Sequence, residues 1–169
     1  RENVTVKEVE NIPYAYEISD YDYIAGLKSF QDGMYQIQDI SSMLAGEYTA
    51  PKAGDTIVDV CGAPGGKSIN AALKMSEQGD CGRVIARDLS DYKVALIDEN
   101  IKRLNITNIQ TQVYDALDCD ESLINKADIV IADLPCSGLG IIGRKPDIKY
   151  NASPEKLQSL VDLQRDILK

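Results

Sequence analysis

TIVDVCGAPGGKS, residues 56–68, is the segment that sets the fold of this 169-residue chain. Its first six residues are mostly apolar or β-branched and predict a buried strand over residues 56–61. A glycine-rich turn follows at residues 62–66, and a helix is expected to begin near Lys67. A strand that passes through a tight turn into a helix is the opening unit of a parallel α/β sheet. The residues expected on the buried side of this helix are Ile69, Ala72, Leu73 and Met75.

The same alternation continues downstream. Residues 79–82 close the first unit, and Arg83–Asp88 predicts a second strand. A helix follows, capped by Ser90 and ended by Asn105. Its expected buried side consists of Val94, Ile97, Ile101 and Leu104.

Two further strands and a final helix complete the pattern. Ile109–Val113 predicts a weaker strand and residues 128–132 (DIVIA) a strong one. Ser153, Pro154 and Glu155 place a cap, a proline and an acid where helices begin. Strands that alternate with helices predict a doubly wound, mostly parallel α/β sheet.

The first 50 residues have a different sequence pattern from the rest of the chain. One alternating stretch, residues 14–18, predicts a strand, residues 38–49 predict a helix, and residues 51–55 (PKAGD) predict the turn into the sheet. We therefore divide the chain into residues 1–50, part of a preceding domain plus a helix that packs on the core, and the α/β domain, residues 51–169. Several tyrosines of the first section could stack on bases, although packing is the favoured interpretation. They are Tyr14, Tyr16, Tyr21, Tyr23 and Tyr35.

Composition excludes several classes of site. The chain has no His and no Trp, which rules out imidazole triads and His-ligated metals within it. The four cysteines have no C-x-x-C spacing, so no metal site is predicted, and reduced thiols indicate a cytoplasmic protein. No apolar run approaches the ~20 residues of a membrane helix, so no membrane partner is expected. Because the chain starts at Arg1, we expect it to be a piece of a longer protein.

Charge is distributed unevenly along the chain. The formal net charge of −9 argues against attraction of nucleic acid by the whole surface. Residues 134–169 nevertheless carry six basic against four acidic residues, and the basic excess centres on Arg144, Lys145 and Lys149. These three cations are candidates for phosphate contact, and an ordinary solvated loop is the alternative.

The glycine-rich turn has the features of a ligand-binding loop. Its glycines let the backbone approach a ligand closely, and Lys67 with the helix N-terminal amides favours a negative group. A plain tight turn is the alternative. The Walker A pattern of phosphate loops requires a glycine where Cys61 stands, so Gly62 is out of place by one residue and a nucleotide triphosphatase is demoted.

Acids follow the next two strands. Asp88 ends the second strand, where an acid in a doubly wound sheet commonly accepts hydrogen bonds from ribose hydroxyls. Asp115, just past the third strand, could receive an adenine amine. A solvated acid in a turn is the alternative for Asp88, and an N-cap or loop acid is the alternative for Asp115.

A second dense motif follows the fourth strand. Asp133-Leu-Pro-Cys136-Ser-Gly138 lies just beyond the carboxyl end of that strand, the edge where open parallel sheets bind ligands. A thiol held there near cations has the setting of a functional cysteine. A buried, inert Cys136 is the alternative.

Taken together, these motifs resemble the RNA cytosine-5 methyltransferases of the bacterial small-subunit rRNA methyltransferase B (Sun/Fmu) and nucleolar-protein type. Members are similar in Cys-Ala-Ala-Pro-Gly-Gly-Lys, here with Gly62 for the first alanine, and in Asp-x-Pro-Cys-Ser-Gly, here residues 133–138. The resemblance extends to Gln38-Asp39-x-Ser41-Ser42 and to residues 144–149, and it covers roughly residues 30–169.

The resemblance implies a class I, Rossmann-like methyltransferase domain that lacks its C-terminal strands and uses S-adenosylmethionine. It places Asp88 on the ribose, Asp115 near the adenine, and Asp133 beside both the methionine portion and the target base. It implies RNA as partner, ribosomal RNA first and transfer RNA second, with Arg144, Lys145 and Lys149 on phosphate. The implied cofactor loop consists of Cys61, Gly62, Ala63, Pro64, Gly65, Gly66 and Lys67.

In the family's chemistry a cysteine thiolate adds to carbon-6 of cytosine, which makes carbon-5 nucleophilic toward the methyl group. That cysteine lies in a Thr-Cys motif on a later strand, beyond Lys169. Cys136 corresponds instead to the Pro-Cys cysteine that helps to release product, although spacing alone leaves an attacking role open. We therefore expect these residues to bind cofactor without turnover. The rivals are a P-loop-like nucleotide triphosphatase and a noncatalytic RNA-binding module on the same fold.

Overall fold

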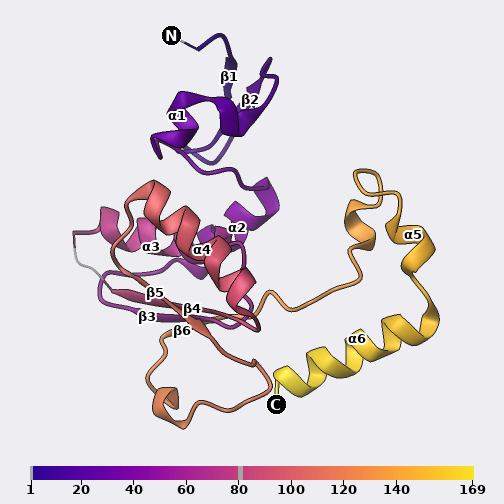
Figure 1. Cartoon of the computed structure of the whole chain (residues 1–169). Helices are drawn as coiled ribbons and strands as arrows, with labels where there is room; N and C mark the ends of the chain where they lie inside the picture. Colours follow the sequence, from indigo (N-terminus) through magenta and orange to yellow (C-terminus); the bar gives the residue numbers. More distant parts are fainter. Residues whose placement is uncertain (1, 80–81) are drawn as a thin grey trace.

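The computed structural model describes residues 2–79 and 82–169 (Figure 1). The predicted closing turn at residues 79–82 therefore lies partly outside the described residues. Cys81 lies outside them too, whereas Cys61, Cys119 and Cys136 are free thiols.

Four parallel strands form the sheet at the centre of the described chain. They are β3 (Thr56–Asp59), β4 (Arg83–Asp88), β5 (Ile109–Val113) and β6 (Ile129–Ile131), in the spatial order β5-β4-β3-β6. The chain moves outward from β3 through β4 to β5 and then returns to the other side of β3. This reversal confirms the predicted doubly wound α/β class. The bounds of β4 and β5 are as predicted, whereas β3 and β6 are each two residues shorter.

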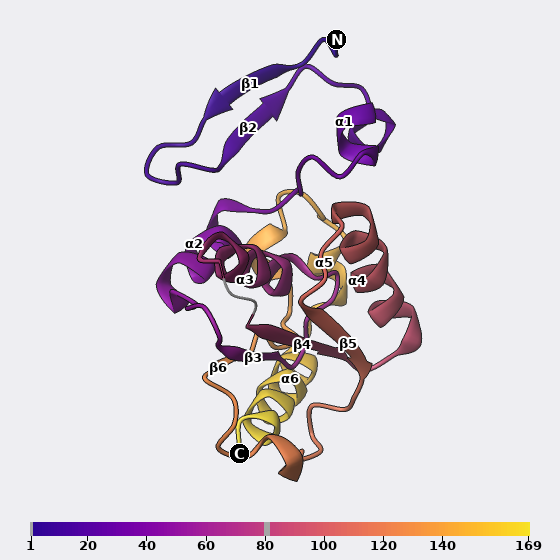
Figure 2. The same cartoon turned by 90° about the vertical axis from the view of Figure 1, so that its left-hand side faces the viewer.

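Three helices cover one side of this sheet: α2 (Ile40–Thr49), α3 (Gly66–Glu77) and α4 (Asp91–Leu104). Figures 1 and 2 show them together above the strands. The hydrophobic core lies between helices and sheet. Its buried cluster consists of Ile57, Ala71, Ala72, Met75 and Val84.

The helix boundaries follow the capping residues. Ser90 accepts a hydrogen bond from the backbone N–H of Lys93, and Asn105 ends α4 in the left-handed conformation at φ 54°. The prediction that Leu73 is buried is wrong, because 44% of that residue is exposed. Leu73 follows Ala72 by about 100° around α3, which takes its side chain to the edge of the buried face.

The N-terminal section forms a hairpin beyond the helix layer (Figure 2). β1 (Thr5–Glu8) pairs antiparallel with β2 (Tyr16–Ser19), two short strands in which nearly every residue is exposed. The sequence predicted β2 about two residues early and did not predict β1, since exposed four-residue strands leave no burial pattern to detect. A 3₁₀ turn (Ile24–Gly26) and α1 (Lys28–Gln31) lead toward α2.

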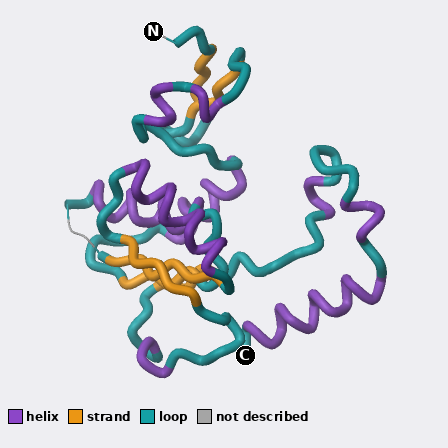
Figure 3. The backbone as a smooth tube through the Cα atoms, viewed as in Figure 1, coloured by secondary structure: helices purple, strands orange, loops and turns teal. Residues whose placement is uncertain are grey.

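The C-terminal limb, residues 132–169, extends from β6 to one side of the sheet (Figure 1). Its first part is mostly loop (Figure 3), with a 3₁₀ turn (Leu139–Ile141) and α5 (Ile148–Asn151). α6 (Pro154–Ile167) begins as predicted, with Ser153 accepting from the N–H of Lys156. Another 3₁₀ turn (Glu121–Leu123) lies between β5 and β6.

None of the helices among the described residues combines the length and apolar character that crossing a membrane requires. Those same residues contain no cluster of acidic and sulfur side chains suited to holding a metal ion.

Candidate cofactor site

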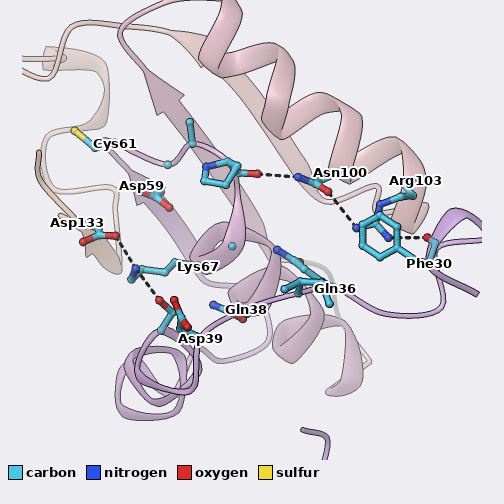
Figure 4. A pocket seen from close by; sticks show the side chains of 16 residues that line it. Phe30, Gln36, Gln38, Asp39, Asp59, Cys61, Lys67, Asn100, Arg103 and Asp133 are labelled. Carbon is cyan, nitrogen blue, oxygen red and sulfur yellow. Dashed lines mark hydrogen bonds and ion pairs between the residues drawn. The ribbon is translucent and has the colours of Figure 1, made fainter. Parts of the chain in front are cut away.

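A cavity of about 390 Å³ lies at the carboxyl ends of the neighbouring strands β3 and β6 (Figure 4). This is the reversal point of strand order, the position at which open α/β sheets bind ligands. Residues from the N-terminal section, the β3–α3 loop, α4 and the end of β6 enclose it. The lining consists of Phe30, Gln36, Ile37, Gln38, Asp39, Ser42, Asp59, Cys61, Gly62, Ala63, Pro64, Gly66, Lys67, Asn100, Arg103 and Asp133.

The glycines of the β3–α3 loop lie in close packing, and the positive φ of Gly65 favours glycine there. Gly65 has φ +105°, and a Cβ on it would lie 3.1 Å from Cδ1 of Ile69 and 3.2 Å from Cγ2 of Ile97. A Cβ on Gly62 would lie 3.2 Å from the Asp59 carboxylate. The loop therefore stays close to the sheet. Gly65 is the N-cap of α3, so no side chain caps that helix and its first amide N–H groups lack a side-chain acceptor. Gly66 and Lys67, the first two residues of α3, line the cavity.

An ion pair joins the two predicted motifs across the reversal point. Nζ of Lys67 lies 2.6 Å from Oδ2 of Asp133, and it also donates to the Ser42 hydroxyl at 3.3 Å (Figure 4). The β3–α3 loop, the end of β6 and the start of α2 thus meet at one cation.

Asp59, the last residue of β3, is an almost fully buried carboxylic acid. Only 1% of it is exposed, and the Ser68 hydroxyl donates to its Oδ2 at 2.6 Å. Burial raises the pKa of Asp59 to about 6, against the opposing effect of the hydrogen bond from Ser68. Burial, followed by the charges of Asp88 and Asp59, also raises the pKa of the Cys61 thiol. Cys61 is therefore neutral and is not a nucleophilic thiolate.

Asp88 lies directly behind the loop. Its carboxylate, 4% exposed, accepts hydrogen bonds from the N–H groups of Ala63 at 3.1 Å and Leu89 at 2.8 Å. Lys93 forms an ion pair with it at 2.9 Å. Asp88 contacts the cavity wall through Ala63 but is not itself part of the lining.

Asp115 lies at the end of the neighbouring strand β5. Its carboxylate accepts a hydrogen bond from the N–H of Leu117 at 3.0 Å. This local contact is the loop role that was the alternative to adenine binding for Asp115. The structure brings it beside β4, since the N–H of Tyr114 donates to the Asp88 carbonyl at 3.0 Å. Asp115 does not belong to the cavity lining.

The remaining predicted residues lie on the C-terminal limb. Cys136 is exposed and outside the cavity lining. Arg144 reaches the rim, where it pairs with Asp39 at 3.1 Å. Lys145 is exposed, and Nζ of Lys149 lies 4.7 Å from the centre of the Tyr150 ring.

Residues 30–42, in the N-terminal section where no site residue was predicted, form one wall of the cavity. We call these residues the strap. Arg103 anchors the strap to α4 by donating to the carbonyls of Phe30 at 3.0 Å and Tyr35 at 2.9 Å, with its guanidinium 3.9 Å from the centre of the Phe30 ring. The Gln38–Ser42 part of the resemblance was the signal that could have found this wall.

Tyr14, from the tyrosine group, packs against the helix layer. It donates to Glu47 at 2.5 Å and accepts from Asn70 at 3.3 Å. Nζ of Lys74 lies 5.2 Å from the centre of its ring. These contacts favour packing over base stacking for Tyr14.

The chain is similar in sequence to ribosomal RNA small-subunit methyltransferases. The family model described as 16S rRNA methyltransferase RsmB/F matches residues 47–169. A protein named probable ribosomal RNA small subunit methyltransferase B, from Bacillus subtilis (strain 168), is 42% identical over 147 residues, which cover 86% of this chain and 32% of that protein. The ribosomal RNA small subunit methyltransferase F of Serratia proteamaculans (strain 568) is 31% identical over 138 residues, covering 80% and 28% respectively.

A solved structure of NSun6 from Pyrococcus horikoshii, with SFG, superposes on the chain with a TM-score of 0.75 at 28% identity. The match covers 91% of this chain and 39% of that one. The chain spans about a third of the length of the curated relatives above.

Proposed function

The chain belongs to the 16S rRNA methyltransferase RsmB/F family, and we propose on that basis that it is the cofactor-binding part of an enzyme that methylates carbon-5 of cytosine in ribosomal RNA. The proposed cofactor is S-adenosylmethionine. Within this proposal, residues 51–169 form the methyltransferase domain and residues 1–50 belong to a preceding domain plus a helix that packs on the core. Because rRNA is the proposed substrate and reduced thiols are expected, we assign the activity to the cytoplasm.

The Lys67–Asp133 ion pair is the observation that carries this proposal. It joins Lys67, which follows the glycine-rich turn, to the first residue of the Asp-x-Pro-Cys motif, and both residues line one cavity. A volume of about 390 Å³ falls within the range of small-molecule sites, and the wall is polar at several points. The residues present therefore fit a nucleoside that carries an amino-acid group.

We propose that separate groups of residues hold separate parts of the cofactor. The loop of residues 61–67 holds the cofactor against the start of α3, Asp88 holds the ribose, and Asp115 lies near the adenine. Asp133 lies between the methionine portion and the target base, where Lys67 keeps its carboxylate in place. When bound, S-adenosylmethionine supplies an electrophilic methyl group.

The C-terminal limb faces the RNA in this proposal. Arg144, Lys145 and Lys149 contact phosphate near the flipped target base. Cys136, exposed just after β6, assists release of the methylated product. The 169 residues contain no Thr-Cys pair, so we propose that by themselves they bind cofactor and do not turn over.

Calorimetry on the 169-residue chain tests the cofactor. S-Adenosylmethionine and S-adenosylhomocysteine should bind with one site per chain, and ATP with magnesium should bind weakly or not at all. The reverse preference would identify the site as a nucleotide triphosphatase loop and contradict the proposal.

A second assay tests turnover. The chain is incubated with S-adenosylmethionine carrying a labelled methyl group and with unmodified rRNA, and the RNA is analysed for 5-methylcytosine. We expect none above the level obtained with heat-denatured chain. Formation of 5-methylcytosine would contradict the proposed absence of turnover, and its loss in Cys136→Ser would identify Cys136 as the attacking thiol.

A further inference from the structure

Two residues of α4 connect two walls of the cofactor cavity that lie far apart in the sequence. One wall is the β3–α3 loop, which contains Pro64, and the other is the strap, which begins at Phe30. Asn100 and Arg103 lie about one turn apart on α4, and both line the cavity. Figure 4 shows their hydrogen bonds as dashed lines that run from the loop through both side chains to the strap.

The side chain of Asn100 has a partner for each of its polar atoms. Nδ2 donates to the Pro64 carbonyl at 3.1 Å and to the Leu96 carbonyl at 3.2 Å. Oδ1 accepts from Nη2 of Arg103 at 3.1 Å. A guanidinium can only donate, so the amide oxygen must face Arg103 and the amide nitrogen must face Pro64. Asn100 is therefore fixed in one orientation, between the loop and Arg103.

Arg103 carries the connection on to the strap. Its Nη1 donates to the carbonyls of Phe30 and Tyr35 at 3.0 and 2.9 Å, while Nη2 donates to Asn100. The guanidinium is a planar, rigid fork, so its orientation cannot change toward one partner without changing toward the others. Asn100 and Arg103 together form what we call the relay, a hydrogen-bonded path from the Pro64 carbonyl to the start of the strap.

A second contact joins the loop to the strap directly. Nζ of Lys67 donates to the Ser42 hydroxyl at 3.3 Å, at the opposite end of the strap from Phe30. The loop is also held to β4, where Asp88 accepts from the Ala63 N–H at 3.1 Å. A substitution in the relay leaves both of these contacts in place, so it changes only the connection through α4.

A ligand that packs against the loop restricts the Pro64 carbonyl, and through the relay it also restricts the strap. We propose that Asn100 and Arg103 are positioning residues which couple the loop to the strap, so that a ligand in the cavity and the docked strap stabilise each other. This coupling is reciprocal: whatever the ligand adds to strap docking, strap docking adds to ligand affinity. The inference rests on the proposed function, since it takes S-adenosylhomocysteine as the ligand that fills the cavity.

Amide hydrogen exchange of the strap measures this coupling. The N–H groups of Asp32, Gly33 and Met34 donate to backbone carbonyls of residues 28–30, so their exchange reports opening of this part of the chain. In the wild-type 169-residue chain, saturating S-adenosylhomocysteine should slow this exchange by about fivefold or more.

Asn100→Asp separates coupling from stability. The new carboxylate keeps an acceptor for Arg103, but it replaces the donor to Pro64 with a second oxygen. The strap should therefore stay docked without ligand, whereas the slowing by S-adenosylhomocysteine should fall below about twofold. The affinity for S-adenosylhomocysteine, measured by calorimetry, should fall by about fivefold. A merely structural role would change exchange equally with and without ligand and would leave the slowing intact.

Glu99→Gln is the matched control, since it also changes the charge of α4 by one unit, at an exposed neighbouring residue. It should retain the full slowing. The melting temperature of each variant is recorded, and if Asn100→Asp does not fold, Arg103→Lys carries the test. A lysine amine cannot hold the strap carbonyls and Asn100 together as the planar fork does, so the slowing should be lost there too.

The outcomes distinguish the coupling from the proposed function. Slowing that persists in Asn100→Asp, an equal loss in Glu99→Gln, or a wild-type strap that does not respond to bound ligand would overturn the inference while the proposed function stands. A wild-type chain that binds no S-adenosylhomocysteine would overturn the proposed function and this inference with it.

Discussion

The Asp88 side chain has two roles in this account: it holds the β3–α3 loop, and we propose that it also holds the ribose. Its carboxylate already accepts from the Ala63 N–H and pairs with Lys93. The sequence placed Asp88 at the sheet edge because it ends the second predicted strand, but it could not show that the same carboxylate also holds the loop.

We expect Asp88→Ala to weaken adenosine binding by about 1–3 kcal/mol, through loss of hydrogen bonds to the ribose hydroxyls. Calorimetry with adenosine and with 2′,3′-dideoxyadenosine separates this effect from disturbance of the loop. The variant should lose more affinity for adenosine than for 2′,3′-dideoxyadenosine, because the loss of the Ala63 contact affects both ligands. An unchanged affinity for adenosine, or the same loss for both ligands, would show that Asp88 does not hold the ribose.

Of the acids predicted to follow strands, Asp88 and Asp115 do not line the cavity. The loop residues Gly62 and Lys67, and also Asp133, line the cavity because the carboxyl ends of parallel strands share one edge. The sequence analysis did not identify Asp59 or Gln38 as site residues. Both line the cavity, Asp59 from the end of β3 and Gln38 from the strap, and only the packed structure shows this.

At the scale of elements, the strap is the part that the sequence described least well. The helical pattern predicted α2, but it did not show that the preceding residues 30–39 turn back across the cavity. That course depends on long-range contacts with Arg103 of α4 and on the close approach of Gly33 to the same helix. β3 and β4 were predictable because each has an apolar centre bounded by turns, whereas β5, with the sequence IQTQV, gave a weaker pattern.

Gly33→Ala tests the importance of strap docking. Gly33 has φ +72°, and a Cβ on it would lie 1.9 Å from the Arg103 carbonyl oxygen. The variant should lower the free energy of unfolding by about 1–3 kcal/mol and weaken cofactor binding, as the strap moves away from α4. Urea unfolding and calorimetry provide the two measurements.

Gly143→Ala is the matched control, since a Cβ there meets nothing within 4 Å. It should change the free energy of unfolding by less than about 0.5 kcal/mol. If the two variants are equally stable, the strap is not held as the structure indicates.

At the scale of the whole molecule, charge separates the two ends of the chain. The first 50 residues carry nine acidic against three basic residues, whereas the C-terminal limb carries the basic excess. The sequence alone predicted this distribution. It could not predict the path of the limb, which extends beside the sheet and has few buried residues to define it (Figures 1 and 3).

Removing two limb cations should weaken RNA binding by the chain. Lys145→Ala combined with Lys149→Ala should lower the affinity for single-stranded rRNA segments and reduce the slope of log K against log salt by about 1.4. Lys52→Ala with Lys126→Ala is the control, since these exposed lysines precede β3 and β6 at the opposite edge of the sheet. Equal slopes for the two double variants would show that the limb does not contact phosphate.

The central claim is that the cavity lined by Lys67 and Asp133 holds an adenosyl amino acid. A crystal structure of the 169-residue chain with S-adenosylhomocysteine tests it most directly. Electron density for the ligand should lie in this cavity, with the ribose toward Asp88 and the amino-acid end toward Asp133. Density instead in the second cavity, of about 480 Å³, between the strap, Tyr14 and α3 would contradict the account.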